Sequence, residues 1–210
     1  GIRYQADPKH RQLILEHFGL DKGSRALKSN GEKEVMDKGE EQEDLDKGET
    51  TVFRGLAARV NFLSLDCPDL QFSGKAASRE MAKPTLGSWK ILKKLARYLL
   101  GREAVVWVFG WQDEAEFAHT FSDSVWGGNA KDRKSTSGGV WMLGGHLIKT
   151  WSAPQGAFAL SSAEAELYGM VEAVTRAKGF FTLAWEIGSR SLSNVVHLGT
   201  ASSAAKSFIS

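Results

Sequence analysis

Apolar residues recur at helical spacing in four stretches of the chain. In each stretch they return every three or four positions, which places them on one face of a helix. Glycine, proline or a capping residue marks the ends, as is common where helices begin or stop. The pattern therefore predicts helices over residues 7–19, 51–65, 86–100 and 162–187.

Other segments replace this spacing with runs of β-branched and aromatic residues, which are typical of strands. They are AVVWVFGW (104–111), FAHTFSDSVW (117–126), GGVWMLGG (138–145), HLIKTWS (146–152) and NVVHLGT (194–200). Gly144 and Gly145 join the third and fourth segments as a hairpin turn. Three antiparallel strands, a helix that crosses over and a further strand define an α/β fold with a mixed sheet.

Residues 21–50 have almost no large apolar side chains and many Gly, Glu, Asp and Lys. This composition predicts a disordered or surface linker. Residues 31–49 hold nine acids and three lysines, a net charge of −6, so the formal net charge of +2 leaves +8 on the rest. A basic body favours a surface for polyanions, although a solvated charged face is the commoner meaning of such an excess.

Composition narrows the class of protein further. Of the 210 residues 42% are hydrophobic, which is enough for a packed core. Cys67 is the one cysteine, which excludes an intramolecular disulfide and a cysteine-based zinc cluster and fits a reducing compartment. Neither a signal peptide nor an apolar run of about eighteen residues is found. We therefore expect an intracellular protein of the cytoplasm or nucleus without membrane contact.

Two acidic residues stand out by their places in this pattern. Asp123 falls inside a predicted strand, where a carboxylate is costly unless it is solvated, paired or bound to a cation. Glu166 falls one turn into the last predicted helix, which must pack on the sheet. The two carboxylates can therefore face each other and hold Mg²⁺ or Mn²⁺, since hard cations prefer oxygen ligands. Glu164 forms a capping box with Ser161, which accounts for Glu164 and leaves Glu166 as the candidate.

Several motifs, in order, resemble those of copia-type LTR retrotransposon Pol polyproteins. The stretches FSDSVWGG, RKSTSGGV, HLIKTWSAPQ and ALSSAEAELYGMVEA are similar to that family's ribonuclease H region. FRGLAARVNFLSLDCPDLQF and GSWKILKKLARYLLG are similar to the segment that joins reverse transcriptase to ribonuclease H, and YQADPKHRQLILEHFGL to the end of the polymerase. The resemblance divides the chain into the end of a reverse transcriptase region (1–20), an acidic linker (21–50), a helical connection (51–103) and a ribonuclease H-like domain (104–210).

The resemblance implies a ribonuclease H-like fold and metal-dependent hydrolysis of the RNA strand of RNA–DNA hybrids, with two Mg²⁺ or Mn²⁺ ions held by a cluster of acids. By position, Asp123 stands for the family's first metal-binding Asp and Glu166 for its helix Glu. Val125 and Ala201 occupy places where the family has an Asp, and the chain stops at Ser210, before the family's last acid. Since two carboxylates cannot hold two cations, we expect a truncated copy that is catalytically inactive.

The remaining motifs leave several functions open. No Tyr-x-Asp-Asp motif occurs, so DNA synthesis is not expected. Arg133, Lys134, Ser135 and Thr136 open a predicted strand and could contact nucleic-acid phosphates, or form an ordinary polar turn. The alternatives to a ribonuclease H are a non-catalytic nucleic-acid-binding remnant, a module that docks a partner through the acidic linker, and a functionless translated pseudogene.

Overall fold

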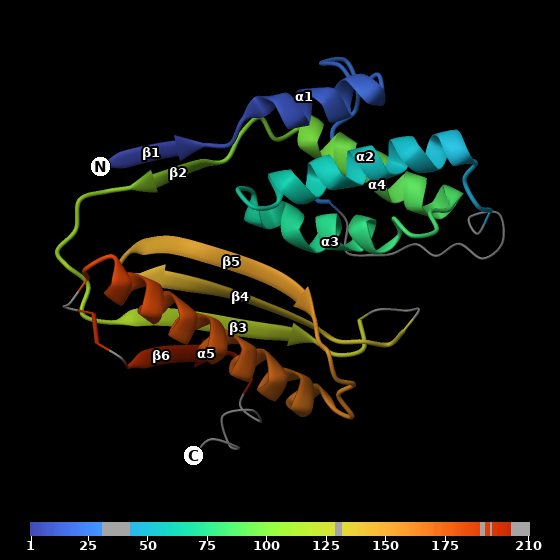
Figure 1. The fold of residues 1–210 in the computed structure, drawn as a ribbon. Coiled ribbons are helices and arrows are strands. Elements are labelled where there is room, and N and C mark those ends of the chain that lie inside the picture. Colours follow the sequence, from blue (N-terminus) through green and yellow to red (C-terminus); the bar gives the residue numbers. More distant parts are fainter. Residues whose placement is uncertain (31–42, 129–131, 190–191, 194, 203–210) are drawn as a thin grey trace. The chain divides into compact units, whose positions relative to one another are not determined.

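The computed structural model of the chain describes residues 1–30, 43–128, 132–189, 192–193 and 195–202. The chain forms two compact units, a helical unit of residues 2–108 and a sheet unit of residues 109–210 with Gly1 (Figure 1). The helical unit contains β1 (Ile2–Gln5), α1 (Pro8–His17), α2 (Lys47–Leu63), the short 3-10 helix η2 (Pro68–Leu70), α3 (Gln71–Arg79), α4 (Leu86–Leu100) and most of β2 (Val106–Phe109).

Side-chain caps mark where α1, α2 and α4 begin in the helical unit. Asp7 accepts a hydrogen bond from the Lys9 amide at 2.8 Å and so caps α1, as expected for the predicted helix 7–19. Thr85 and Ser88 form a capping box ahead of α4. Helix α4 has the bounds that the apolar spacing predicts, because cap and periodicity point to the same start.

Helix α2 begins at Lys47, earlier than the predicted helix over 51–65. A capping box formed by Asp46 and Glu49 opens it, and both acids lie within the expected linker of 21–50. The sequence pattern therefore does not reveal the capping box, because its two acids stand in a stretch whose acidic composition predicts a linker. The rest of the linker prediction falls largely on residues 31–42, which lie outside the described residues.

Replacing Asp46 by Ala is expected to lower the free energy of unfolding by about 1 kcal/mol, because the Glu49 amide loses its acceptor. Asp46 Oδ1 accepts from this amide at 2.7 Å, and Glu49 Oε2 accepts from the Asp46 amide at 3.1 Å. Urea denaturation followed by circular dichroism measures the change. Asp44→Ala is the matched control, since it removes the same charge but only an exposed ion pair with Lys83, worth at most about 1 kcal/mol. Equal losses in the two variants would contradict the assignment of the cap.

The core of the helical unit lies between the apolar faces of its helices. Its fully buried large side chains are Ile14, Phe53, Val60, Leu70, Leu92 and Leu95. The apolar pattern does not predict α3, because the buried positions of this helix are Ser73, Gly74 and Ala77. Small residues let α3 approach α2 closely, since a Cβ atom at Gly74 would lie 3.3 Å from Val60 Cγ1.

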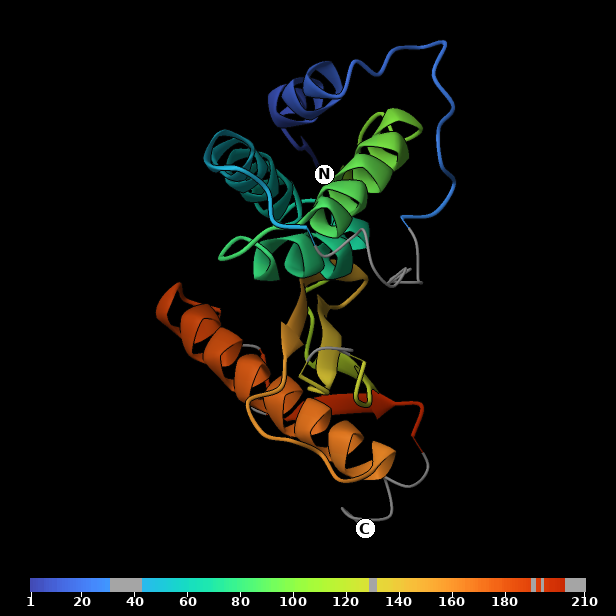
Figure 2. The ribbon, with the colours of Figure 1, turned by 90° about the vertical axis from the view of Figure 1, so that its right-hand side faces the viewer.

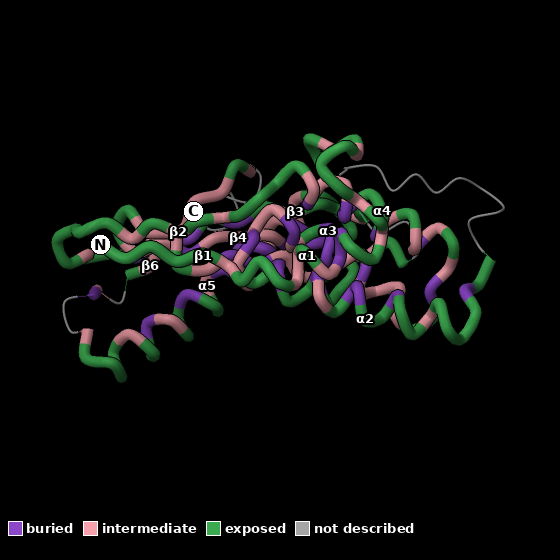
Figure 3. Tube along the Cα trace, turned by 90° about the horizontal axis from the view of Figure 1, so that it is seen from above, coloured by how far each residue is buried: buried purple, intermediate pink, exposed green. Residues whose placement is uncertain are grey.

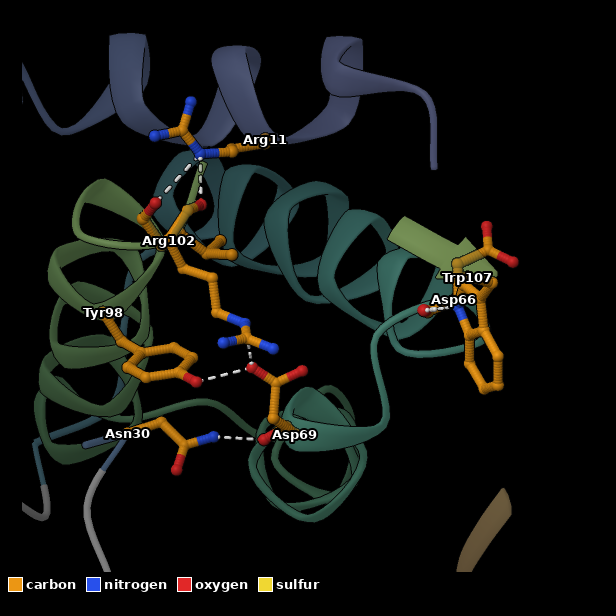
Figure 4. A network of polar contacts seen from close by, with 8 residues as sticks. Arg11, Asn30, Asp66, Asp69, Tyr98, Arg102 and Trp107 are labelled. Atoms are coloured by element: carbon orange, nitrogen blue, oxygen red, sulfur yellow. Dashed lines mark hydrogen bonds and ion pairs between the residues drawn. The ribbon is translucent and has the colours of Figure 1, made fainter. Parts of the chain in front are cut away.

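A polar network holds the end of α4 against its neighbours (Figure 4). The Arg11 guanidinium donates to carbonyl oxygens at the end of α4 and to that of Arg102, and so satisfies a helix C-terminus. The Asp69 carboxylate pairs with Arg102 at 2.6 Å and accepts from the Tyr98 hydroxyl. Burial, followed by this bond to Asp69, raises the pKa of Tyr98 to about 12. The network fixes the chain where it leaves α4.

The predicted strand over 104–111 has a partner that the pattern does not indicate. Its observed part, β2, pairs with β1 in a two-stranded sheet, separate from the four-stranded one. The chain segment that forms β1 is too short, at four residues, to show an alternating pattern.

The sheet unit is a four-stranded mixed sheet with one long helix across it (Figures 1 and 2). Its elements are β3 (Ala118–Val125), β4 (Thr136–Leu143), β5 (His146–Pro154), α5 (Ser162–Glu186) and β6 (Val196–Thr200). The strand order is β5-β4-β3-β6, with β3 antiparallel to β4 and parallel to β6. The expected α/β fold with a mixed sheet is therefore confirmed, including the hairpin turn, where Gly144 has a φ of +58°.

Helix α5 covers the face of the sheet that carries the core. Ala118, Thr120 and Ser122 of β3 are buried in alternation with more exposed neighbours. Buried positions likewise recur along α5 between exposed ones (Figure 3); they are Ala165, Gly169, Met170, Ala173, Ala177 and Phe181. The packing of α5 on this face brings side chains of α5 close to β3. None of the described helices is long and apolar enough to cross a membrane.

Candidate active site

The contact of α5 with β3 brings Asp123 and Glu166 together. Asp123 is exposed on the central strand, opposite Gly138 of β4. Glu166 lies in the second turn of α5, and its Oε1 accepts a hydrogen bond from the Ser124 amide at 3.2 Å. Asp123 immediately precedes Ser124, and its negative charge acts on the Glu166 carboxyl group. The two acids singled out in the sequence thus share one site between strand and helix.

The environment of Glu166 resists ionisation. Burial raises the pKa of Glu166 above its ordinary value. The hydrogen bond from the Ser124 amide opposes this rise, and the charge of Asp123 adds to it. The folded chain therefore keeps this proton to a higher pH than the unfolded chain does. Folding stability falls as the pH rises from the unfolded to the folded pKa, so ionising the pair costs stability. A positive charge beside the two carboxylates would offset this cost.

Gly169 lets α5 approach β3 at the site. A Cβ atom at Gly169 would lie 2.6 Å from Ser124 Oγ and 3.7 Å from Asp123 O, so the backbones are closer than a side chain allows. Gly169 follows Glu166 by three residues, and both therefore lie on the side of α5 that faces β3. The short approach is what allows the Glu166 side chain to reach the Ser124 amide.

Gln155 lies beneath the acid pair, only 5% exposed. Its Nε2 donates to the Ala165 carbonyl at 2.7 Å, to Ser137 Oγ at 2.9 Å and, more weakly, to Ser124 Oγ at 3.3 Å. These three partners belong to α5, β4 and β3. In the part of the chain that the structure describes, Gln155 Oε1 and Glu166 Oε2 are buried without a hydrogen-bond partner.

The Glu164 carboxylate is engaged in hydrogen bonds at the N-terminus of α5. Its amide donates to Ser161 Oγ at 3.1 Å, while its carboxylate accepts from the Leu160 amide and from the Tyr168 hydroxyl, both at 2.7 Å. The Tyr168 hydroxyl and then the Leu160 amide lower the pKa of Glu164. The capping role expected of Glu164 is confirmed. Its carboxylate, however, accepts from the backbone amide of Leu160 and not from that of Ser161.

The two non-acidic positions lie close to Asp123. Val125 is two residues further along β3 and half exposed. In the parallel pairing of β3 with β6, Ser122 is opposite Thr200, so Ala201 follows at the level of Asp123. Ala201 is exposed and leaves this place without a carboxylate. Among the described residues no group of three or more His, Cys, Asp or Glu side chains could hold a metal ion.

The basic run at the start of β4 consists of exposed Arg133, half-buried Lys134 and the buried residues Ser135 and Thr136. Ser135 and Thr136 are buried, and Ser135 Oγ accepts from the Gly127 amide at 3.1 Å, so both hydroxyl side chains belong to the packing of the turn. Arg133 is exposed and has a φ of +55°, and the Lys134 ammonium lies 5.7 Å from the centre of the Phe158 ring. Arg133 and Lys134 remain as candidates for contact with phosphates.

Three residues of the site are missing from the sequence-based candidates. Gln155, Ser124 and Gly169 hold the acids in place, but none of them is ionisable, so their side chains do not signal metal-binding or acid–base chemistry in the sequence. The Glu-x-x-Gly spacing of Glu166 and Gly169 was the available signal, because it places a glycine one turn from an acid on the same helix face. Nothing in the sequence marks the burial of Gln155.

No family model matches the chain. The chain is similar to two retrovirus-related Pol polyproteins of Arabidopsis thaliana. It is 30% identical over 138 residues to the one from transposon RE2, an alignment that covers 66% of this chain and 9% of that protein. It is 29% identical over 140 residues to the one from transposon RE1, with coverages of 67% and 10%. An uncharacterized mitochondrial protein of the same plant is 31% identical over 140 residues, with coverages of 66% and 55%.

A mixed sheet crossed by one helix, with two acids at their contact, defines an α/β protein with a candidate acidic site. The similarity to retrovirus-related Pol polyproteins of transposons agrees with the copia-type resemblance of the motifs. The chain spans about a tenth of the length of the two Pol polyproteins it matches.

Proposed function

We propose that the sheet unit is a ribonuclease H-like domain of a copia-type Pol polyprotein, and that Asp123 and Glu166 are its metal-binding acids. The hydrogen bond from the Ser124 amide to Glu166, which places Glu166 beside the residue that follows Asp123, carries the proposal. The central place of β3, between an antiparallel and a parallel neighbour, supports it. The family activity would be metal-dependent hydrolysis of RNA in RNA–DNA hybrids. In the same proposal the helical unit is the connection from the end of the reverse transcriptase.

The donor set of the site fits a hard divalent cation. Two carboxylates supply the oxygen ligands that Mg²⁺ and Mn²⁺ prefer. Glu166 Oε2 is buried without a hydrogen-bond partner among the described residues, and a cation would satisfy it. A bound ion would supply charge stabilisation and an activated water for phosphodiester hydrolysis. The residues of this chain would hold Glu166 beside Asp123. The Ser124 amide contributes to this by donating a hydrogen bond to Glu166 Oε1.

Ala201 supports the further proposal that this copy does not cleave. The carboxylate expected at the level of Asp123 is absent, and two acids do not fix two cations. Removing one group that stabilises charge in a transition state typically costs about a hundredfold or more in rate. A non-catalytic protein that still binds nucleic acid is the second candidate function, and Ala201 together with exposed Arg133 and half-buried Lys134 favours it.

Binding and cleavage of an end-labelled RNA–DNA hybrid test both candidates. In Mg²⁺ or Mn²⁺ the unmodified chain is expected to bind the hybrid without cutting it. Arg133→Ala with Lys134→Ala is expected to weaken binding and to lower the slope of log affinity against log salt by about 2, one per phosphate contact. Lys178→Ala with Lys149→Ala, which removes the same charge elsewhere in the sheet unit, is the control.

Two outcomes would overturn parts of the proposal. Cleavage by the unmodified chain that disappears in Glu166→Gln would keep the site and refute the proposed inactivity. A salt slope that is the same in both double variants would remove Arg133 and Lys134 from the phosphate contact.

A further inference from the structure

Gln155 joins every element that carries the acid pair. Its side-chain nitrogen contacts Ala165 of α5, Ser137 of β4 and Ser124 of β3. Its own backbone amide donates to the Ser135 carbonyl at 2.8 Å, which fixes Gln155 to the turn before β4. One buried side chain thus connects the helix to two adjacent strands.

Two of the three residues that Gln155 contacts, Ala165 and Ser124, are next in sequence to the acids. Ala165 precedes Glu166, and Ser124 follows Asp123. The Ala165 carbonyl can only accept, so the amide nitrogen must face it, and the bond fixes the height of the first turn of α5 over β3. Ser124 Oγ in turn donates to the same carbonyl at 2.9 Å. A shift of α5 along β3 would break both bonds.

We infer that Gln155 is a positioning residue for the Asp123–Glu166 pair, because it fixes the helix turn that carries Glu166 against the strand that carries Asp123. The inference rests on the proposed metal-binding function of the pair. Gln155 touches neither carboxylate, and it acts by setting the place of the helix turn that carries Glu166. In metal sites, partners behind the ligands typically change metal affinity by about 10- to 100-fold when they are removed.

Gln155→Met tests the inference in the full chain. Methionine keeps the length of the side chain and removes both donor hydrogens. Thr120→Val is the matched control. Thr120 is also fully buried on β3 and donates to the Val140 carbonyl at 3.0 Å, so its loss removes a buried hydrogen bond away from the acid pair. Circular dichroism establishes that both variants are folded under the conditions used.

The first measurement is Mn²⁺ binding, followed by the paramagnetic resonance of the free ion. Gln155→Met is expected to weaken Mn²⁺ binding by about 10- to 100-fold, whereas Thr120→Val leaves it within about twofold. The second measurement needs no metal. The Ser124 amide donates to Glu166, so its hydrogen exchange is expected to accelerate in Gln155→Met more than that of neighbouring β3 amides, and to follow them in Thr120→Val.

The outcomes separate this inference from the proposed function. Mn²⁺ affinity and Ser124 exchange in Gln155→Met that match those in Thr120→Val would overturn the positioning role. Failure of the unmodified chain to bind Mn²⁺, or equal affinity in Glu166→Gln, would overturn the metal-binding function. In that case the Ser124 exchange rate alone decides whether Gln155 places Glu166.

Discussion

Replacing Ala201 by Asp is expected to produce cleavage of an RNA–DNA hybrid at a rate about a hundredfold or more above that of the unmodified chain. The parallel register of β3 and β6 carries this expectation. Ser122 is opposite Thr200, so position 201 comes level with Asp123. A carboxylate there would add a third oxygen donor to Asp123 and Glu166 for the cation. Ala201 is exposed, so the described residues leave room for the larger side chain.

The same substitution is expected to tighten Mn²⁺ binding, which separates ligand supply from catalysis. Ala201→Asn is the matched control, since it has the same size without the charge. Ala201→Asp combined with Glu166→Gln tests whether the new carboxylate acts through the old pair. An Asn variant as active as the Asp variant, or a double variant as active as the single one, would contradict the assigned site.

Gly169→Ala and Gly179→Ala are expected to change the stability of the sheet unit in opposite directions. Both glycines lie within α5, where alanine is favoured over glycine by about 1 kcal/mol. At Gly179 the described residues outside its own helix turn leave the added Cβ atom free of any neighbour within 4 Å, so the gain is realised in full. At Gly169 the added atom would lie 2.6 Å from Ser124 Oγ, and overpacking of this kind costs about 1–3 kcal/mol.

The two variants are compared by urea unfolding of the full chain. Since the helix-propensity gain is common to both, the difference between them reports the overpacking alone, about 1–3 kcal/mol. Gly169→Ala is further expected to weaken Mn²⁺ binding, because separating α5 from β3 withdraws Glu166 from the Ser124 amide. If the two glycines respond alike, the close approach of α5 does not depend on Gly169.

The sequence predicts best where several signals agree. For α4, an apolar stripe, a capping threonine and a closing glycine coincide, and the helix has the expected bounds. The meeting of Asp123 and Glu166 follows from the order of elements, because a helix that crosses over from an antiparallel sheet must pack on its central strand. In both cases a local pattern and a topological rule restrict the answer to one arrangement.

The sequence predicts poorly where packing depends on small or uncharged residues. Helix α3 buries Ser73, Gly74 and Ala77, which carry no hydrophobic signal. Gln155 is an amide in a loop, and only the three-dimensional arrangement reveals that α5, β3 and β4 converge on it. The support of the site is therefore less visible in the sequence than the acids that it supports.

Because position 201 is exposed, it is expected to mutate earlier than the buried residues that support the acid pair. Selection for a folded, soluble chain acts on Gly169 and Gln155, because substitutions there disturb packing. It does not act on an exposed residue at the end of β6, where a lost carboxylate also relieves crowding of negative charge. Once selection for activity relaxes, the surface ligand drifts first and the buried support persists, since only changes that cross a stability threshold are removed. Under the proposed function, a copy of this kind would remain a folded protein and stay available for binding roles that need no chemistry.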